Sequence, residues 1–236
     1  MWVNLLSRLS ALANCCLARF LQLAEARWAA VANADMVNFY AETFGVKRVV
    51  FPRVLSVEEI AAINREIDIE SEVFIFGGLC VMTEGRCSMS SYITGLSPNM
   101  NGVCSPASHV TYTEEDNTLA ARLGGYTIHR SAKHEAAPYP TLCKGCFKVG
   151  PRTGYVFEDP ASLDASELLP ALARAGVSAL KIEGRQRSRS YVTQVVRNFR
   201  NAVEALADGR PMPVGMLAGL TEGQTTTSGA YKKIWR

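Results

Sequence analysis

The sequence predicts an α/β fold built on a parallel sheet or barrel and interrupted by a long cysteine-rich segment. Short apolar strands alternate with amphipathic helices over residues 31–76 and 151–210, a rhythm typical of βα units. Between them, residues 77–150 are rich in Gly, Ser, Pro, Asn and Thr and hold five of the seven cysteines. Because long irregular loops are uncommon in compact domains, we expect something to hold this segment in place.

Composition narrows the class of protein. The chain has 236 residues, 48% of them hydrophobic and 20% charged, so it is a folded protein. The net charge of +3 is too small to indicate a nucleic acid or a membrane surface. No apolar run approaches the roughly 20 residues of a membrane span. From this net charge we expect no nucleic-acid partner. An odd number of cysteines is a poor disulfide framework, so we expect a reducing, cytoplasmic location.

The first βα region is expected to follow an atypical N-terminal helix. Residues 1–30 repeat apolar side chains every three or four positions, which predicts a packing helix or, alternatively, a partner-binding or membrane-surface helix. The elements predicted next are a helix over 35–44 ending at Gly45, a strand over 47–51, a helix from the capping box at 56–59 to about residue 65, and a strand over 72–76 ended by Gly77 and Gly78.

The second βα region resumes after the cysteine-rich segment. The predicted elements are a strand over 155–157, a helix over 164–175, a strand over 177–182 and a helix over 190–207. The last helix has its apolar side chains at helical spacing, as expected when one face packs on a sheet. Residues 211–236 contain Pro, Gly and Thr and are predicted to be an irregular tail.

Cys80, Cys87, Cys104 and Cys143 are the candidate metal ligands, at the spacing C-x6-C-x16-C-x38-C. Four thiolates complete the ligand set of a tetrahedral zinc or of a 4Fe–4S cluster. Structural zinc sites usually use cysteine pairs two to four residues apart, and Cys143 and Cys146 are the one such pair in this segment. The spread favours a 4Fe–4S cluster, with zinc or unligated thiols as alternatives and Cys146 competing for the fourth position.

Several separated motifs resemble one protein family. They are EVFIFGGLCVMTEGRC, NGVCSP, YPTLCKG, the KIEGR of residues 181–185 and the ending SGAYKKIWR. In this order and spacing they resemble the peptidase U32 family, collagenase-like proteins of unknown catalytic type, and within it the members of ubiquinone biosynthesis. The resemblance covers about residues 31–236.

This resemblance implies a fold and a cofactor. The fold is a TIM-type barrel with a cysteine-bearing insertion, and the cofactor is a 4Fe–4S cluster on Cys80, Cys87, Cys104 and Cys143. A full barrel typically needs about 250 residues. Without residues 77–150 too few remain for eight βα units, so we expect a partial barrel that lacks its N-terminal strands.

The same resemblance implies a reaction and partners. The reaction is a dioxygen-independent hydroxylation in ubiquinone biosynthesis, performed as a heterodimer with a homologous, UbiV-like subunit. The implied small molecules are a quinone precursor and prephenate as the source of oxygen. A collagenase-like peptidase and a non-catalytic truncated scaffold are the alternatives.

Two charged residues beyond the strand at 177–182 are the candidate catalytic residues. Active sites of barrels lie at the C-terminal ends of their strands, where Glu183 and Arg185 stand. Arg185 can grip a carboxylate through two hydrogen bonds, and Glu183 can orient a substrate or act as a base. An ordinary ion-pair network at a strand end is the alternative.

Overall fold

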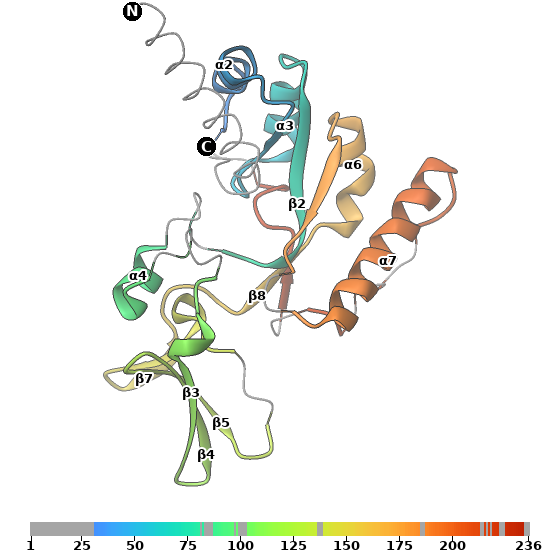
Figure 1. The fold of residues 1–236 in the computed structure, drawn as a ribbon. Coiled ribbons are helices and arrows are strands. Elements are labelled where there is room, and N and C mark those ends of the chain that lie inside the picture. Colours follow the sequence, from blue (N-terminus) through green and yellow to red (C-terminus); the bar gives the residue numbers. More distant parts are fainter. Residues whose placement is uncertain are drawn as a thin grey trace, which may run out of the picture.

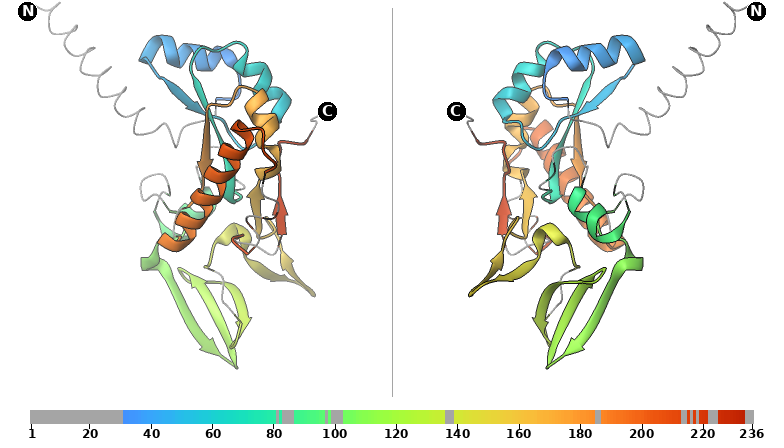
Figure 2. Two further views of the ribbon diagram at one scale, coloured as in Figure 1. Left: turned by 90° about the vertical axis from the view of Figure 1, so that its right-hand side faces the viewer. Right: turned by 90° about the vertical axis from the view of Figure 1, so that its left-hand side faces the viewer.

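The computed structural model describes residues 31–80, 82, 87–96, 98, 103–135, 139–184, 187–212, 215, 217, 219–221 and 225–233. The helix predicted over 1–30 lies outside these residues. The described part consists of a sheet flanked by helices and, beyond one end of that sheet, a unit of antiparallel strands (Figure 1). Figure 2 shows from both sides that this second unit projects away from the main sheet.

The main sheet is mixed rather than purely parallel. Its order is β1-β2-β8-β10, and β9 also pairs with β2. Strands β1 and β9 run parallel to β2, whereas β8 runs antiparallel to it. The elements are α2 (Ala34–Phe44), β1 (Arg48–Val50), α3 (Val57–Asn64), β2 (Glu70–Gly78), β8 (Ala161–Asp164), α6 (Leu169–Arg174), β9 (Ala179–Ile182), α7 (Arg189–Ala207) and β10 (Thr225–Thr227).

The predicted α/β class is confirmed, and the described strands do not close into a barrel. The core lies between the sheet and its helices. Val73 and Ile75 of β2 are fully buried, together with Ile60 of α3 and Val195 of α7. Burial of such side chains is the main favourable contribution to folding. No helix of the described part has the length and apolar character that crossing a membrane requires.

Local end signals explain why the helices begin and end where they do. The side chain of Asn33 accepts a hydrogen bond from Met36 N, and α2 ends at Gly45, whose φ is 68°. In α3 both hydrogen bonds of the predicted capping box form between Ser56 and Glu59. Caps of this kind satisfy backbone N–H groups that have no partner within the helix.

The segment 77–150 is more regular than its composition predicts. It contains α4 (Ser88–Thr94), short 3-10 helices η1 (Ala107–His109) and η2 (Leu142–Lys144), the strands β3 (Val110–Glu115), β4 (Thr118–Leu123) and β5 (Tyr126–Ala132), and β6 (Cys146–Val149). The strands β3-β4-β5 form an antiparallel sheet, and β6 pairs with β7 (Arg152–Tyr155). We call residues 87–157 the cysteine unit below.

Two predicted elements of the second βα region are wrong in position. The strand expected over 155–157 is β7, which ends at Tyr155 after pairing with β6. The helix expected from residue 164 begins later, because residues 161–164 form β8 and residues 166–168 a 3-10 turn before α6. Residues 161–164 become the strand β8 because they pair with β2 and β10, and such pairing is not visible in local periodicity.

Candidate functional site

The four candidate ligands lie on separate segments near the C-terminal end of β2. Cys80 follows β2 directly, and Cys87 is the N-cap residue of α4. Cys104 precedes η1, whereas Cys143 is buried within η2. All four are free thiols, as is Cys146.

Ser90 of α4 ties the segments of Cys87 and Cys104 together. Its backbone N–H donates to Cys87 Sγ at 3.3 Å, and its hydroxyl donates to the carbonyl oxygen of Cys104. Helix α4 also contacts η2, which carries Cys143. Three of the four cysteine segments therefore meet at α4.

The carbonyl of Ala161 in β8 connects the neighbours of the other pair. Leu79 N and Lys144 Nζ each approach Ala161 O at 3.5 Å. Leu79 precedes Cys80, and Lys144 follows Cys143. The chain thus returns after more than sixty residues to the point where it left β2.

The ionisation of the thiols reflects this proximity. The pKa of Cys143 is raised to about 12, chiefly by burial; the thiols of Cys80, Cys104 and Cys87 contribute to the rise, and the ammonium of Lys144 opposes it. Burial also raises the pKa of Cys104, with smaller contributions from Cys87 and Cys80. Charges influence one another this way only at short range, so the four thiols are neighbours.

Cys146 faces a different environment. It pairs with Tyr155 across the β6–β7 hairpin. Burial raises the pKa of Tyr155, and the Cys146 thiol adds to the rise. Cys143 is buried within η2, whereas Cys146 begins β6 and is half-buried opposite Tyr155.

The donor set fits an iron–sulfur cluster in its chemistry. Four free thiols are soft ligands, and four thiolates are what such a cluster requires. Within the described part, no three or more His, Cys, Asp or Glu side chains form a group that could hold a metal ion as they stand. The thiols are neighbours without converging on one point.

A second polar group lies at the C-terminal ends of three strands. Arg53 follows β1, and its Nη2 lies 2.7 Å from Oε2 of Glu183, which follows β9. The guanidinium stacks over the ring of Phe74 in β2, with 3.6 Å to the ring centroid. The Glu183 backbone N–H donates to the carbonyl of Phe76 at 2.8 Å, which fixes the strand end beside β2.

Further contacts extend this group along the sheet. Lys181 Nζ lies 2.7 Å from Oε1 of Glu72. The hydroxyl of Tyr231 donates to the carbonyl of Phe74. Burial raises the pKa of Tyr231, and the nearby Arg53 opposes that rise. The ion-pair network expected as an alternative is present, with Glu183 as a member of it.

Of the two predicted catalytic residues, only Glu183 is placed, because Arg185 lies outside the described residues. Arg53 was not among the residues predicted from the sequence, although a signal for it was present. Arg53 stands just beyond the strand predicted over 47–51, as Glu183 stands beyond the strand predicted over 177–182. The same rule about strand ends would have selected both.

Gly77 joins the polar group to the cysteine segment. A Cβ at Gly77 would lie 2.5 Å from both Cβ and the backbone O of Glu183, and the φ of Gly77 is +127°. Only glycine accepts this approach without strain. Since Gly77 precedes Cys80 by three residues, the same turn that seats Glu183 directs the chain toward the first thiol.

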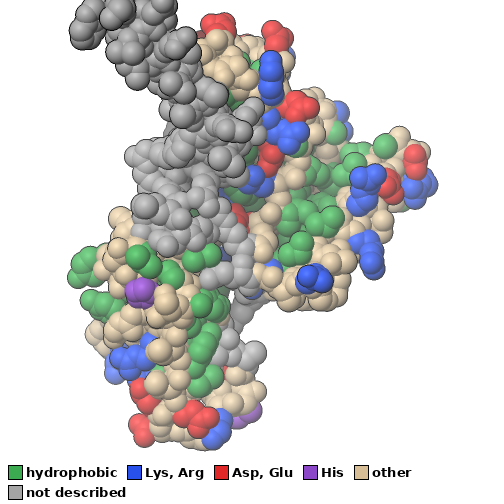
Figure 3. Space-filling model, in the orientation of Figure 1, with side chains coloured by type: hydrophobic (Ala, Val, Ile, Leu, Met, Phe, Trp, Pro, Cys, Tyr) green, Lys and Arg blue, Asp and Glu red, His purple; other side chains and the backbone are tan. Residues whose placement is uncertain are grey.

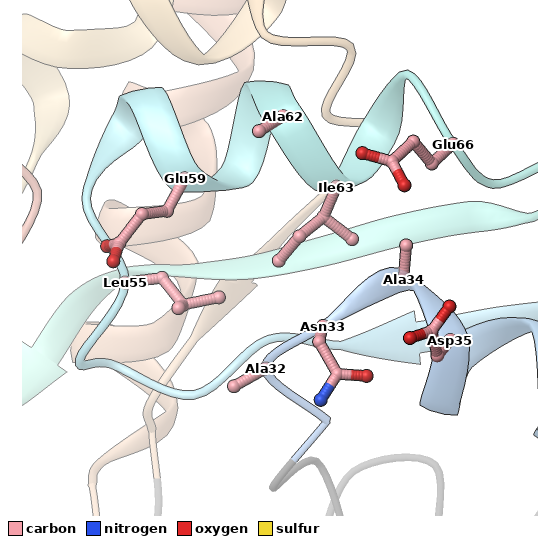
Figure 4. A pocket seen from close by; sticks show the side chains of 9 residues that line it. All are labelled: Ala32, Asn33, Ala34, Asp35, Leu55, Glu59, Ala62, Ile63 and Glu66. Carbon is pink, nitrogen blue, oxygen red and sulfur yellow. The ribbon is translucent and has the colours of Figure 1, made fainter.

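A cavity of about 300 Å³ lies elsewhere, between the start of α2 and α3 (Figure 4). Two of its polar side chains, Asn33 and Glu59, are already used as helix caps. None of the predicted site residues lines it. It lies at the opposite end of the main sheet from α4 (Figure 1), so we do not assign the function to it.

Known proteins are similar to this chain over most of its length. The tRNA hydroxylation protein P of Haemophilus influenzae is 29% identical over 226 residues, covering 81% of this chain and 48% of that protein. Its Escherichia coli counterpart is 32% identical over 219 residues, covering 80% and 46%. The 23S rRNA 5-hydroxycytidine C2501 synthase of E. coli is 30% identical over 195 residues, covering 83% and 24%. The chain thus spans less than half of each relative, and no solved structure matches it.

These relatives correct the expected function and partners. The expected likeness was to the family's members of ubiquinone biosynthesis such as UbiU, with a dioxygen-independent role in that pathway, a UbiV-like partner and a quinone precursor. The relatives instead carry the names of tRNA and rRNA hydroxylation proteins. The expectation of no nucleic-acid partner is overturned with them. Net charge reports long-range attraction to phosphate and not the local contacts of a site.

The family itself was identified correctly from the motifs. The model of Peptidase family U32 matches residues 20–225. This range includes the four cysteines, Arg53 and Glu183. This chain belongs to peptidase family U32.

Proposed function

We propose that this chain holds a 4Fe–4S cluster with Cys80, Cys87, Cys104 and Cys143 and takes part in the hydroxylation of an RNA base. The observation that carries the proposal is that four free thiols stand on four separate segments beside the end of β2, three of which are joined at α4. The RNA part is supported by the names of the relatives, which are tRNA and rRNA hydroxylation proteins. When bound, the cluster would supply electron-transfer chemistry.

A cluster is favoured over a single zinc by how the thiols are supplied. Zinc knuckles use two cysteines on one tight turn. Cys143 lies in η2, whereas Cys146 begins β6, so the one close pair in the sequence stands on two different elements. The four proposed ligands are therefore spread over four separate segments, which suits the four corners of a 4Fe–4S cluster.

The polar group at the strand ends is proposed to handle the base. Glu183 offers a carboxylate to an exocyclic amine or a hydroxyl of the substrate, or accepts a proton from it. Arg53 orients that carboxylate through its 2.7 Å ion pair and is itself held by the ring of Phe74. The guanidinium positions and does not react.

We also propose that the main sheet is one section of a TIM-type barrel wall. Strands β1, β2 and β9 are parallel neighbours, and their C-terminal ends carry the polar group. Active residues of such barrels gather at this edge. Because the chain spans less than half of its relatives, a complete pocket would need strands besides those described.

The test of the cofactor is metal analysis of protein purified without oxygen. We expect about four irons and four sulfides per chain, with broad absorption near 400 nm. Changing Cys80, Cys87, Cys104 or Cys143 to Ser should remove most of the iron. Cys146→Ser is the matched control and should keep it. Zinc without sulfide, or equal iron loss in Cys146→Ser, would contradict the assignment.

The test of the reaction is mass spectrometry of nucleosides from tRNA and rRNA of bacteria that do or do not express the chain. We expect hydroxylated nucleosides to depend on the chain and to disappear in the Cys80→Ser variant. Unchanged nucleosides in cells that make iron-loaded protein would reject the RNA part and leave the cluster standing.

A further inference from the structure

Exposed aromatic side chains gather on the cysteine unit. Apart from Phe39 on α2, all the large aromatic side chains that the described part leaves exposed lie between residues 87 and 157. They are Tyr92, Tyr112, Tyr126, Tyr139 and Phe157. A folded protein has no stability reason to present so many rings to water in one unit, and such patches commonly mark binding sites.

Tyr92 and Tyr126 are the centre of this patch. Tyr92, on α4, is 79% exposed, and Tyr126, at the start of β5, is 50% exposed. A hydrogen bond with the Tyr92 side chain raises the pKa of Tyr126, so the two phenols touch. The backbone fixes the pair, because Ile93 O would lie only 3.1 Å from a Cβ at Gly124, on the turn before Tyr126.

The register of the sheet extends the patch by one more ring. Tyr126 lies opposite Leu123, and Tyr112 lies opposite Ala121. Leu123 and Ala121 are two positions apart on β4, so their partners share one face of the sheet. Tyr112 is 44% exposed.

The cations of the cysteine unit divide into two groups. Residues 87–157 contain six Lys and Arg residues and four Asp and Glu residues. Arg122, Arg130 and Lys133 pair with Glu114 or Glu115, whereas Lys144, Lys148 and Arg152 lie between η2 and β7. The acidic residues of the cysteine unit, Glu114, Glu115, Asp116 and Glu135, lie toward the β3–β4 turn, at the other end of β4 from α4. In Figure 3 the acidic side chains of this unit gather at its lower tip.

Two of these cations are exposed and suited to bind phosphate. Lys148 and Arg152 are exposed on the β6–β7 hairpin, and β6 contacts β5, the strand of Tyr126. Aromatic rings on which bases can stack, on a unit that also exposes cations, are what unpaired nucleotides require.

We propose that Tyr92 and Tyr126 form a stacking surface for an unpaired base of the RNA substrate, with Lys148 and Arg152 beside its phosphates. This inference rests on the proposed function, since it names where that RNA binds. Cys87 caps the helix that carries Tyr92, so the base on this surface sits next to the cysteine site. The surface binds RNA and has no part in the reaction itself.

The test measures the affinity of the full, iron-loaded chain for a fluorescent twelve-nucleotide single-stranded RNA and for bulk tRNA, by anisotropy at fixed salt. We expect Tyr92→Ala and Tyr126→Ala each to weaken binding roughly tenfold. Tyr92→Phe and Tyr126→Phe keep the ring and should bind within about twofold of the unchanged chain. Phe39→Ala, an exposed ring on α2, should have no effect.

The two proposals fail separately. If the wild-type chain binds RNA and the Tyr92→Ala/Tyr126→Ala double variant binds it with the same affinity, the stacking surface is overturned and RNA hydroxylation stands. The stacking surface is also overturned if the double variant changes only the association of two chains with each other, measured by light scattering. A wild-type chain that neither binds RNA nor changes any nucleoside overturns both. Iron content and circular dichroism of each variant exclude unfolding as the cause of lost binding.

Discussion

Arg53 and Glu183 are 130 positions apart, yet their Nη2 and Oε2 atoms lie 2.7 Å from each other. The pair spans the C-terminal ends of β1 and β9, with Phe74 of β2 beneath the guanidinium. The Nε of Arg53 is buried and makes no hydrogen bond with the residues described. In this arrangement a largely buried cation holds one carboxylate in place, which is more typical of functional sites than of solvated surfaces.

Replacing Arg53 by Ala should destabilise the fold. Glu183 would lose its cation while only 29% of its side chain is exposed. Both partners retain some exposure, so we expect the free energy of unfolding to fall by about 1–3 kcal/mol, below the figure for fully buried pairs. Urea unfolding measures this. Arg200→Ala is the matched control, since Arg200 pairs with Glu204 in water and should cost under about 0.5 kcal/mol. Equal losses would show that the Arg53 pair is ordinary.

Replacing Glu183 by Gln should separate catalysis from folding. The amide oxygen can still accept from Arg53, so stability and iron content should stay close to those of the unchanged chain. The charge is lost, and we expect the rate of nucleoside hydroxylation to fall by about 100-fold or more. Glu204→Gln on α7 should leave the rate unchanged. A normal rate in Glu183→Gln would remove Glu183 from the reaction.

Replacing Gly77 by Ala should disturb both halves of the site. The new methyl would meet the backbone of Glu183 at 2.5 Å, in a backbone conformation with φ of +127°. We expect a loss of about 2–4 kcal/mol in unfolding free energy and reduced iron binding at Cys80. Gly209→Ala is the control: its φ is +66° with nothing within 4 Å, so it should cost about 1 kcal/mol and keep the iron. Equal costs would mean that the close approach is unimportant.

What the sequence predicted correctly depends on short-range signals. Asn33, Ser56 and Gly45 fix helix ends through contacts within four residues, so α2 and α3 appear where their patterns place them. The hairpins of the cysteine unit carried similar signals that composition obscured. Asp116 and Asn117 both have positive φ, at 48° and 63°, as a two-residue hairpin turn requires.

The rest depends on contacts between distant segments. The antiparallel pairing of β8 with β2 and the ion pair of Arg53 with Glu183 join residues whose relation is invisible in local spacing. The candidate thiols could be selected from the sequence because thiols are few. The substrate could not, since four thiols and a carboxylate at a strand end are compatible with more than one substrate.

The Tyr231 hydroxyl gives the site a pH-dependent element. It donates to the Phe74 carbonyl, and burial raises its pKa above the ordinary value of about 10. The folded chain therefore binds this proton more tightly than the unfolded chain does. The resulting stability is fully present below pH of about 10 and is lost as the pH rises from there toward the folded pKa.

Tyr231→Phe should reveal this dependence in urea unfolding. At pH 8 the variant loses the hydrogen bond to Phe74 and leaves that carbonyl unpaired, so we expect it to be less stable by about 1–3 kcal/mol. Above pH of about 10 the unchanged chain loses stability that the variant does not have to lose, and the gap should narrow. Because both proteins share every other titrating group, their difference isolates this phenol. A stability difference between the two proteins that stays constant from pH 8 to 11 would show that Tyr231 ionises as easily in the folded chain as in the unfolded chain. The hydrogen bond from Tyr231 to the Phe74 carbonyl would then be too weak to hold Phe74 in place.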